Sequence, residues 1–100
     1  MYEFKGIDLS TKYVKPSTWD WLAEWADDES IDCPIDCHVY DGGYGMLIWT
    51  YSADPEDKRL PGDLAYIIAT AQDREWRFIV LDADGADCEL FPSFDAEWPD

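Results

Sequence analysis

The sequence has few basic residues and a single histidine. Its 100 residues hold 23 Asp and Glu against 7 Lys and Arg, so the formal net charge is −16. Because nucleic-acid binding requires basic side chains that neutralise phosphates, this balance argues against direct contact with DNA or RNA. The lone His38 also removes most Ser–His and Cys–His schemes of nucleophilic catalysis. We therefore expect neither a nucleic-acid-binding protein nor an enzyme.

Long apolar runs and a secretion signal are missing as well. No apolar stretch approaches the ~20 residues that a membrane-spanning helix needs. The first residues, Met1 to Lys5, lack the charged and then apolar layout of a signal peptide. The three cysteines are an odd number in a chain without export signals, which favours reduced thiols. These features predict a cytoplasmic protein that has no contact with membranes.

Apolar and aromatic residues are plentiful. The hydrophobic share is 47%, with six Trp, six Tyr and four Phe. An acidic chain this apolar is not expected to be disordered, and its length suits one domain with an aromatic-rich core. We predict a single globular domain over residues 1–91 and an acidic C-terminal tail over residues 92–100.

The order of predicted elements is β-α-β-β-α-β-β. Alternating and helical apolar spacings, together with turn residues, place strands at 2–9, 35–40, 44–51, 76–81 and 88–91, and helices at about 17–29 and 60–75. Asp41-Gly42-Gly43 and Asp84-Gly85 are typical of hairpin turns. This pattern predicts an α+β fold, a mostly antiparallel sheet with both helices packed on one face.

The first predicted helix has an apolar and an acidic side. Ser17 or Thr18 is the expected N-cap. The apolar side is made of Trp19, Leu22, Ala23 and Ala26, with Trp25 beside them, and the acidic side of Asp20, Glu24, Asp27 and Asp28. Acids at this spacing repel one another and oppose the helix dipole near the C-terminal end. Local stability would not select such a stripe, which indicates a binding role.

The charge is also unevenly distributed along the chain. Residues 20–57 hold eleven acids and no base, and residues 82–100 hold seven acids and no base. Sixteen of the 23 acids are Asp, whose short side chain keeps the charge close to the backbone. We predict a partner-binding surface with an exposed Trp21 as one possible anchor and Trp98 as another. The candidate site residues are Asp20, Trp21, Glu24, Asp27, Asp28, Glu29, Asp32, Asp54, Glu56 and Asp57.

Three motifs that could indicate a metal site or an enzyme match poorly: a zinc site, a calcium-binding loop and a phosphatase motif. Cys33, Cys37, His38 and Cys88 include enough ligands for zinc, but adjacent Cys37 and His38 point to opposite faces of a strand. Cys37 is then a core residue and His38 a surface residue. Asp82, Asp84 and Asp87 do not match the spacing of a calcium-binding EF-hand loop. We expect no metal and no cofactor.

The segment Trp76 to Gly85 resembles the strand and Asp-x-Asp-Gly opening of haloacid-dehalogenase phosphatases. In that family the first Asp is the nucleophile, and a doubly wound domain follows it. Only 15 residues follow Gly85 here. A strand that ends in an Asp-Gly turn is the simpler interpretation.

Several motifs resemble a family of small uncharacterised proteins of bacterial plasmids, phages and integrated elements, known only as a domain of unknown function. They are Ile7-Asp8-Leu9-Ser10-Thr11, Tyr40 with Gly45, Leu60-Pro61 with Leu64, Trp76 to Asp84, and the closing Leu90-Phe91 and Trp98. Where the family often has His after the Ser-Thr pair, this chain has Lys12-Tyr13. The resemblance implies a mobile-element origin, and such elements often encode small acidic proteins that block host defences.

Charge and resemblance together lead to one functional hypothesis and two alternatives. The hypothesis is an acidic inhibitor or decoy that binds the cationic nucleic-acid-binding surface of a host defence or DNA-processing protein by DNA mimicry, of the anti-CRISPR or anti-restriction type. The first alternative is an acidic interaction module, antitoxin-like or an adaptor, whose partner does not bind nucleic acid. The second is that the acidity serves only solubility or a high-salt cytoplasm.

Overall fold

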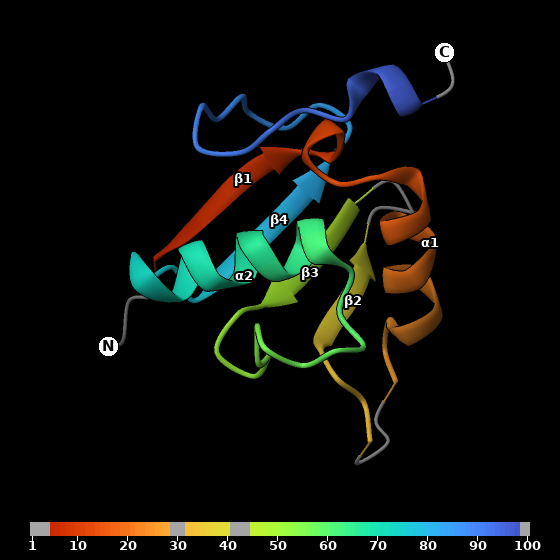
Figure 1. Ribbon diagram of the computed structural model, residues 1–100, viewed down its shortest axis with the longest axis vertical. Helices are drawn as coiled ribbons and strands as arrows, with labels where there is room; N and C mark the ends of the chain where they lie inside the picture. Colours follow the sequence, from red (N-terminus) through yellow and green to blue (C-terminus); the bar gives the residue numbers. More distant parts are fainter. Residues whose placement is uncertain (1–4, 29–31, 41–44, 99–100) are drawn as a thin grey trace.

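A mixed four-stranded sheet forms the centre of the computed structural model, which describes residues 5–28, 32–40 and 45–98 (Figure 1). The strands are β1 (Gly6–Ser10), β2 (Asp36–Tyr40), β3 (Gly45–Trp49) and β4 (Phe78–Asp82), in the spatial order β1-β4-β3-β2. β1 runs parallel to β4, whereas the β4–β3 and β3–β2 pairs are antiparallel. The predicted α+β class is confirmed. The predicted turn at residues 41–43 lies outside the described residues.

Two helices cover one face of this sheet. They are α1 (Pro16–Trp25) and α2 (Gly62–Asp73), and short 3-10 turns lie at Thr11–Tyr13 (η1) and Asp95–Glu97 (η3). In Figure 1, α2 crosses the sheet and α1 lies beside β2. Inward residues of neighbouring strands, such as Ile79, Ile48 and Cys37, lie side by side in register and are buried. The thiol of Cys37 donates to the carbonyl of Leu22 in α1 at 3.6 Å, which joins that helix to the same face.

The second helix follows its sequence pattern closely. Its buried residues are the predicted Leu64, Ile67, Ile68 and Ala71. Gly62 lies at the first helical position, directly after Pro61. The helix ends at Asp73, and Glu75 adopts a positive φ of 63°. Trp76 N–H then bonds the carbonyl of Ala71 at 2.8 Å, which satisfies a carbonyl of the last turn.

The first helix departs from its prediction at both ends. Its N-cap is Lys15, with no side-chain cap, so Ser17 and Thr18 lie inside the helix. Thr18 is instead buried, and its hydroxyl donates to Asp63 of α2 at 2.8 Å. Ala23, predicted to face the core, is exposed.

The end of α1 has a tertiary cause. The helix ends at Trp25, and Asp27 has a positive φ of 59° that turns the chain. In this conformation the N–H of Asp27 bonds the carbonyl of Cys37 in β2 at 2.8 Å. Acids near a helix C-terminus interact unfavourably with the helix dipole, and a helix that ends before Asp27 and Asp28 avoids this electrostatic interaction.

The predicted last strand is wrong. Residues 88–91 form a turn instead of pairing with the sheet. After Gly85 the chain crosses the end of β1, where Ala86 accepts a hydrogen bond from Ser10 N–H at 3.0 Å. The segment then returns along η1, and Phe94 N–H bonds the carbonyl of Lys12 at 2.6 Å. Figure 1 shows this C-terminal segment at the end of the sheet where β1 terminates.

The face of the sheet that neither helix covers is unusually apolar. Its central positions are occupied by Leu47 and Trp49 of β3 and by Val80 and Phe78 of β4, all half-buried. The rings of Trp49 and Phe78 pack edge to face, with centroids 5.8 Å apart. Polar residues are usual at such positions when a sheet faces water. We call these four residues the apolar strip.

Candidate functional site: an acidic depression beside α1 and β2

An open depression of about 360 Å³ lies where the end of α1 meets β2. It is lined by Asp27, Asp28, Cys33, Ile35, Asp36, His38 and Ser52. Three carboxylates from two separate segments therefore surround one concave site. We call this site the acidic depression.

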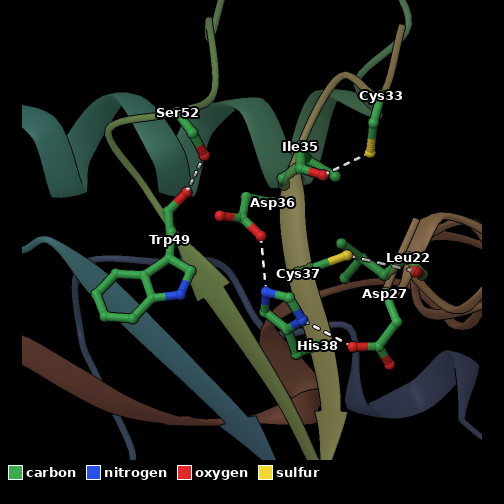
Figure 2. Close-up of polar contacts among 9 residues, drawn as sticks. All are labelled: Leu22, Asp27, Cys33, Ile35, Asp36, Cys37, His38, Trp49 and Ser52. Atoms are coloured by element: carbon green, nitrogen blue, oxygen red, sulfur yellow. Dashed lines mark hydrogen bonds and ion pairs between the residues drawn. The ribbon is translucent and has the colours of Figure 1, made fainter. Parts of the chain in front are cut away.

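His38 occupies the centre of the polar network in the acidic depression. Its Nδ1 lies 2.7 Å from Oδ1 of Asp27, and its Nε2 lies 2.7 Å from Oδ1 of Asp36 (Figure 2). Hydrogen bonding to Asp27, and then to Asp36, raises the pKa of His38 above its usual value. The imidazolium form donates from both nitrogens, with one hydrogen bond to each carboxylate. The network thereby holds Asp27, two residues after the end of α1, against β2.

The cysteines near the depression differ in their surroundings. The Cys33 thiol donates to the carbonyl of Ile35 at 2.8 Å and lines the depression. Cys37 faces the core, and burial raises its pKa to about 12. As the alternation predicts, Cys37 and His38 lie on opposite faces of β2. Across the residues that the structure describes, no three His, Cys, Asp or Glu side chains are grouped as metal ligands.

The predicted acidic site is brought together only in part. Asp27 and Asp28 line the depression, but they lie beyond the end of α1 and so do not continue a helical stripe. Asp20 and Glu24 remain on α1, where both are exposed. Glu29 lies outside the described residues. The predicted four-residue stripe is thus reduced to two residues on the helix.

The remaining predicted acids belong to two loops that Arg59 joins. Its guanidinium pairs with both carboxylate oxygens of Asp57, at 2.8 and 3.1 Å, and donates to the carbonyl of Asp32 at 2.7 Å. Arg59 also lowers the pKa of Asp57. Asp54 and Glu56 are exposed in the same loop, whose turn is closed by Glu56 N–H bonding Asp54 at 2.9 Å. One cation therefore sits inside the predicted all-acid surface.

The two predicted tryptophan anchors are not exposed. Trp21 is half-buried, packs against the core and lies 6.3 Å from the ring of Trp25. Trp98 also packs against the core, and its indole N–H bonds the carbonyl of Val14 at 2.9 Å. Large aromatic rings lose solvent exposure wherever a core surface is near, which the helical spacing of Trp21 could not show.

Two residues of the depression, Asp36 and His38, are missing from the predicted acidic site, although His38 was considered as a zinc ligand. Their spacing of two in a strand places both on the same outer face, which was a usable signal. Their approach to Asp27 depends on the turn after α1 and has no local signal. Arg59 was missed because the sequence places it outside the acidic block 20–57.

The fold and the depression define a small acidic α+β domain. Residues 6–96 match the model described as the C-terminal domain of a family of unknown function, DUF5983. The chain belongs to this family. No curated protein and no solved structure matches it. In the part of the chain that the structure describes, helices are too short or too polar to cross a membrane.

Proposed function

We propose that this protein is an acidic inhibitor or decoy that binds the cationic nucleic-acid-binding surface of another protein. The partner would be a host defence or DNA-processing protein, and the chain would come from a plasmid, phage or integrated element. This is the anti-CRISPR or anti-restriction type of DNA mimicry. The proposal requires a cytoplasmic location, to which the free state of Cys33, Cys37 and Cys88 is suited.

The observation that carries the proposal is the acidic depression. Asp27, Asp28 and Asp36 converge on it, and among the described residues of its lining only His38 is basic. A concave site with excess carboxylate fits the side chain of an Arg or Lys that would otherwise contact a phosphate. The exposed Asp20 and Glu24 on α1 extend the negative charge beyond the depression.

The carboxylates are held in place, which favours recognition over diffuse repulsion. Asp27 is fixed by its backbone bond to Cys37 and by His38, and Asp36 by its place in β2 and by His38. Groups already ordered in the free protein lose less conformational entropy on binding. A solvated surface that served only solubility would not need these contacts.

The test is a competition between this protein and DNA. A fluorescent duplex is bound to each of three purified proteins: a nucleoid protein, a restriction endonuclease and a guide-loaded CRISPR effector. We expect the protein to displace the duplex from at least one of them at low salt. Its affinity for that partner, measured directly, should fall as salt is raised, because charge steers the association.

A matched pair of variants assigns the effect to the depression. The double variant Asp28→Asn with Asp36→Asn should bind about fivefold to thirtyfold more weakly, since each exposed carboxylate contributes ~0.5 to 1 kcal/mol. The control, Asp73→Asn with Glu97→Gln, removes the same charge at exposed positions elsewhere. Equal losses in both variants, or no displacement of the duplex at low salt from any of the three, would overturn the proposal.

The apolar strip of the sheet favours the alternative function, an interaction module whose partner does not bind nucleic acid. Leu47, Trp49, Phe78 and Val80 form an apolar surface with acids at its edges, including Asp8 and Asp36. In that case Trp49→Ser should abolish binding to a cognate partner, whereas the double variant in the depression should have little effect.

A further inference from the structure

A second cavity of about 320 Å³ lies on another part of the molecule, between α2, η1 and the C-terminal segment. Its walls include four aromatic rings, those of Tyr13, Tyr66, Phe91 and Phe94. Ile67 adds an aliphatic side chain, and Asp63 adds a carboxylate. We call this site the aromatic cavity, and it shares no residue with the acidic depression.

The rings of the aromatic cavity meet at steep angles. Phe91 packs edge to face against Tyr13, with centroids 6.2 Å apart, and against Tyr66, with centroids 5.8 Å apart. Tyr13 and Phe91 are buried, whereas Tyr66 is 55% exposed and lies at the rim. These contacts order the rings, and the cavity has aromatic side chains in several parts of its wall, as do the aromatic cages that bind organic cations.

The walls are fixed in the free protein. The hydroxyl of Tyr13 accepts the N–H of Cys88 at 2.7 Å, and Phe94 N–H bonds the carbonyl of Lys12 at 2.6 Å. Asp63 accepts the N–H of Lys15 and the hydroxyl of Thr18, each at 2.8 Å. These bonds join η1, α1, α2 and the C-terminal segment around the cavity, so a guest would not have to order them.

Charge selects the kind of guest. The chain's own cations already lie over two of the rings: Lys12 is 5.5 Å from the centre of Tyr13, and Lys15 is 5.5 Å from the centre of Phe94. Neither lysine lines the cavity. Tyr66 at the rim is therefore the expected platform for a further cation, with the ring of Phe91 behind it and Asp63 as the counter-charge. Asp63 already accepts two kinds of neutral donor, and an uncharged guest would cover its carboxylate without supplying a counter-charge.

We propose that the aromatic cavity binds an arginine side chain of the protein's basic partner. This inference rests on the proposed function, because that function supplies an arginine-rich partner. Guanidinium is planar and weakly hydrated, stacks on aromatic rings and pairs with a carboxylate, whereas the lysine ammonium is a strongly hydrated point charge. The aromatic cavity then adds an anchor to the charge contacts at the acidic depression.

The test is a titration of ¹⁵N-labelled protein followed by NMR, with N-acetylarginine amide as the probe. N-acetylcitrulline amide is the matched probe, since it has nearly the same shape and no charge. We expect saturable shifts of the amides of residues 62–67, Phe91, Ser93 and Phe94. Citrulline should bind about fivefold to thirtyfold more weakly at this site, because a cation–π contact contributes ~1 to 2 kcal/mol.

Two tyrosine variants separate the cavity from general effects. Tyr66→Leu should weaken arginine binding at residues 62–67 and 91–94 by a similar factor. Tyr51→Leu is the control, because Tyr51 is also an exposed tyrosine, at 48%, and does not line the cavity. Both substitutions are at exposed positions, and the spectrum of each free variant verifies that it is folded.

The outcomes separate this inference from the function on which it rests. Equal shifts with citrulline, no shift at these residues, or full binding by Tyr66→Leu would overturn the arginine site. Shifts confined to Asp27, Asp28 and Asp36 would also overturn it, while they support the acidic depression. If Tyr66→Leu displaces DNA as well as the parent protein does, the proposed function is kept and the aromatic cavity is not an anchor for the partner.

Discussion

Replacing Gly85 with alanine should destabilise the domain strongly, although the residue lies in a turn outside the sheet. A Cβ at this position would lie 2.2 Å from the carbonyl oxygen of Leu9, 2.3 Å from its carbon and 2.6 Å from the nitrogen of Ser10. All three are backbone atoms of β1, so no side chain can rotate to make room. The turn would have to move away from the strand.

The magnitude follows from what that movement disrupts. Overpacking of this kind costs ~1 to 3 kcal/mol. The hydrogen bond from Ser10 N–H to Ala86, at 3.0 Å, adds ~1 kcal/mol if it is lost. We therefore expect Gly85→Ala to lower the free energy of unfolding by ~2 to 4 kcal/mol. For a domain of this size, that corresponds to a fall in Tm of about 10 to 30 °C.

The measurement is thermal and urea unfolding followed by circular dichroism, with Gly62→Ala as the control. Gly62 is at the first position of α2, and a Cβ there meets nothing within 4 Å. Alanine at Gly62 should leave Tm unchanged or raise it slightly, because it lowers the entropy of the unfolded chain. A Gly85→Ala protein with a Tm within about 3 °C of the parent would refute the close approach of turn and strand.

Three further predictions concern single side chains. The pKa of His38 is raised in the folded state, so its contacts with Asp27 and Asp36 stabilise the fold fully below about pH 6.5, and this stabilisation is lost as pH rises through the folded pKa. Urea titrations from pH 6 to 8 should show that the free energy of unfolding falls by ~1 kcal/mol or less. His38→Gln should not show this fall. Cys37, with a pKa of about 12, should resist iodoacetamide at pH 8 in the native protein, while Cys33 and Cys88 react. Mass spectrometry should count two adducts in buffer and three in urea. An adduct on Cys37 in the native protein would contradict its burial. Glycine at position 75 adopts the positive φ of 63° without the ~1 to 2 kcal/mol penalty of other residues, but it raises the entropy of the unfolded chain, which offsets ~0.4 to 1 kcal/mol. Glu75→Gly should therefore raise Tm by at most about 8 °C, and a lowered Tm would argue against that conformation.

The sequence was most informative where local spacing decides the structure. The apolar spacing of α2 predicted all four of its buried residues, because a helix packed on a sheet must turn one stripe inward. The alternation of β2 likewise separated the buried Cys37 from the surface His38. The α+β class follows from these local patterns.

The errors fall where a distant segment decides the outcome. The first helix has the composition to continue to Glu29, yet the bond between Asp27 and Cys37 turns the chain earlier. Asp84-Gly85 was interpreted as a hairpin turn, but Gly85 allows a close approach to β1 and no strand follows it. The acidic depression also depends on contacts between distant segments. His38 joins Asp27, eleven positions earlier, to Asp36, and no local pattern links these two acids.

The parallel pairing of β1 with β4 has a consequence for the order of folding. Gly6 pairs with Phe78, 72 positions later, whereas Tyr40 and Gly45 pair across a short connection. Loop-closure entropy rises with the length of chain enclosed, so the β2–β3 hairpin is favoured to form before β1 joins the sheet. The two sites then mature at different stages. The acidic depression is built from the end of α1, from β2 and from the nearby Cys33, Ile35 and Ser52. The aromatic cavity also needs α2, η1 and the C-terminal segment, and the last two meet beside β1. If both proposals hold, a chain arrested before that last step would present the carboxylates of the acidic depression but would lack the arginine site.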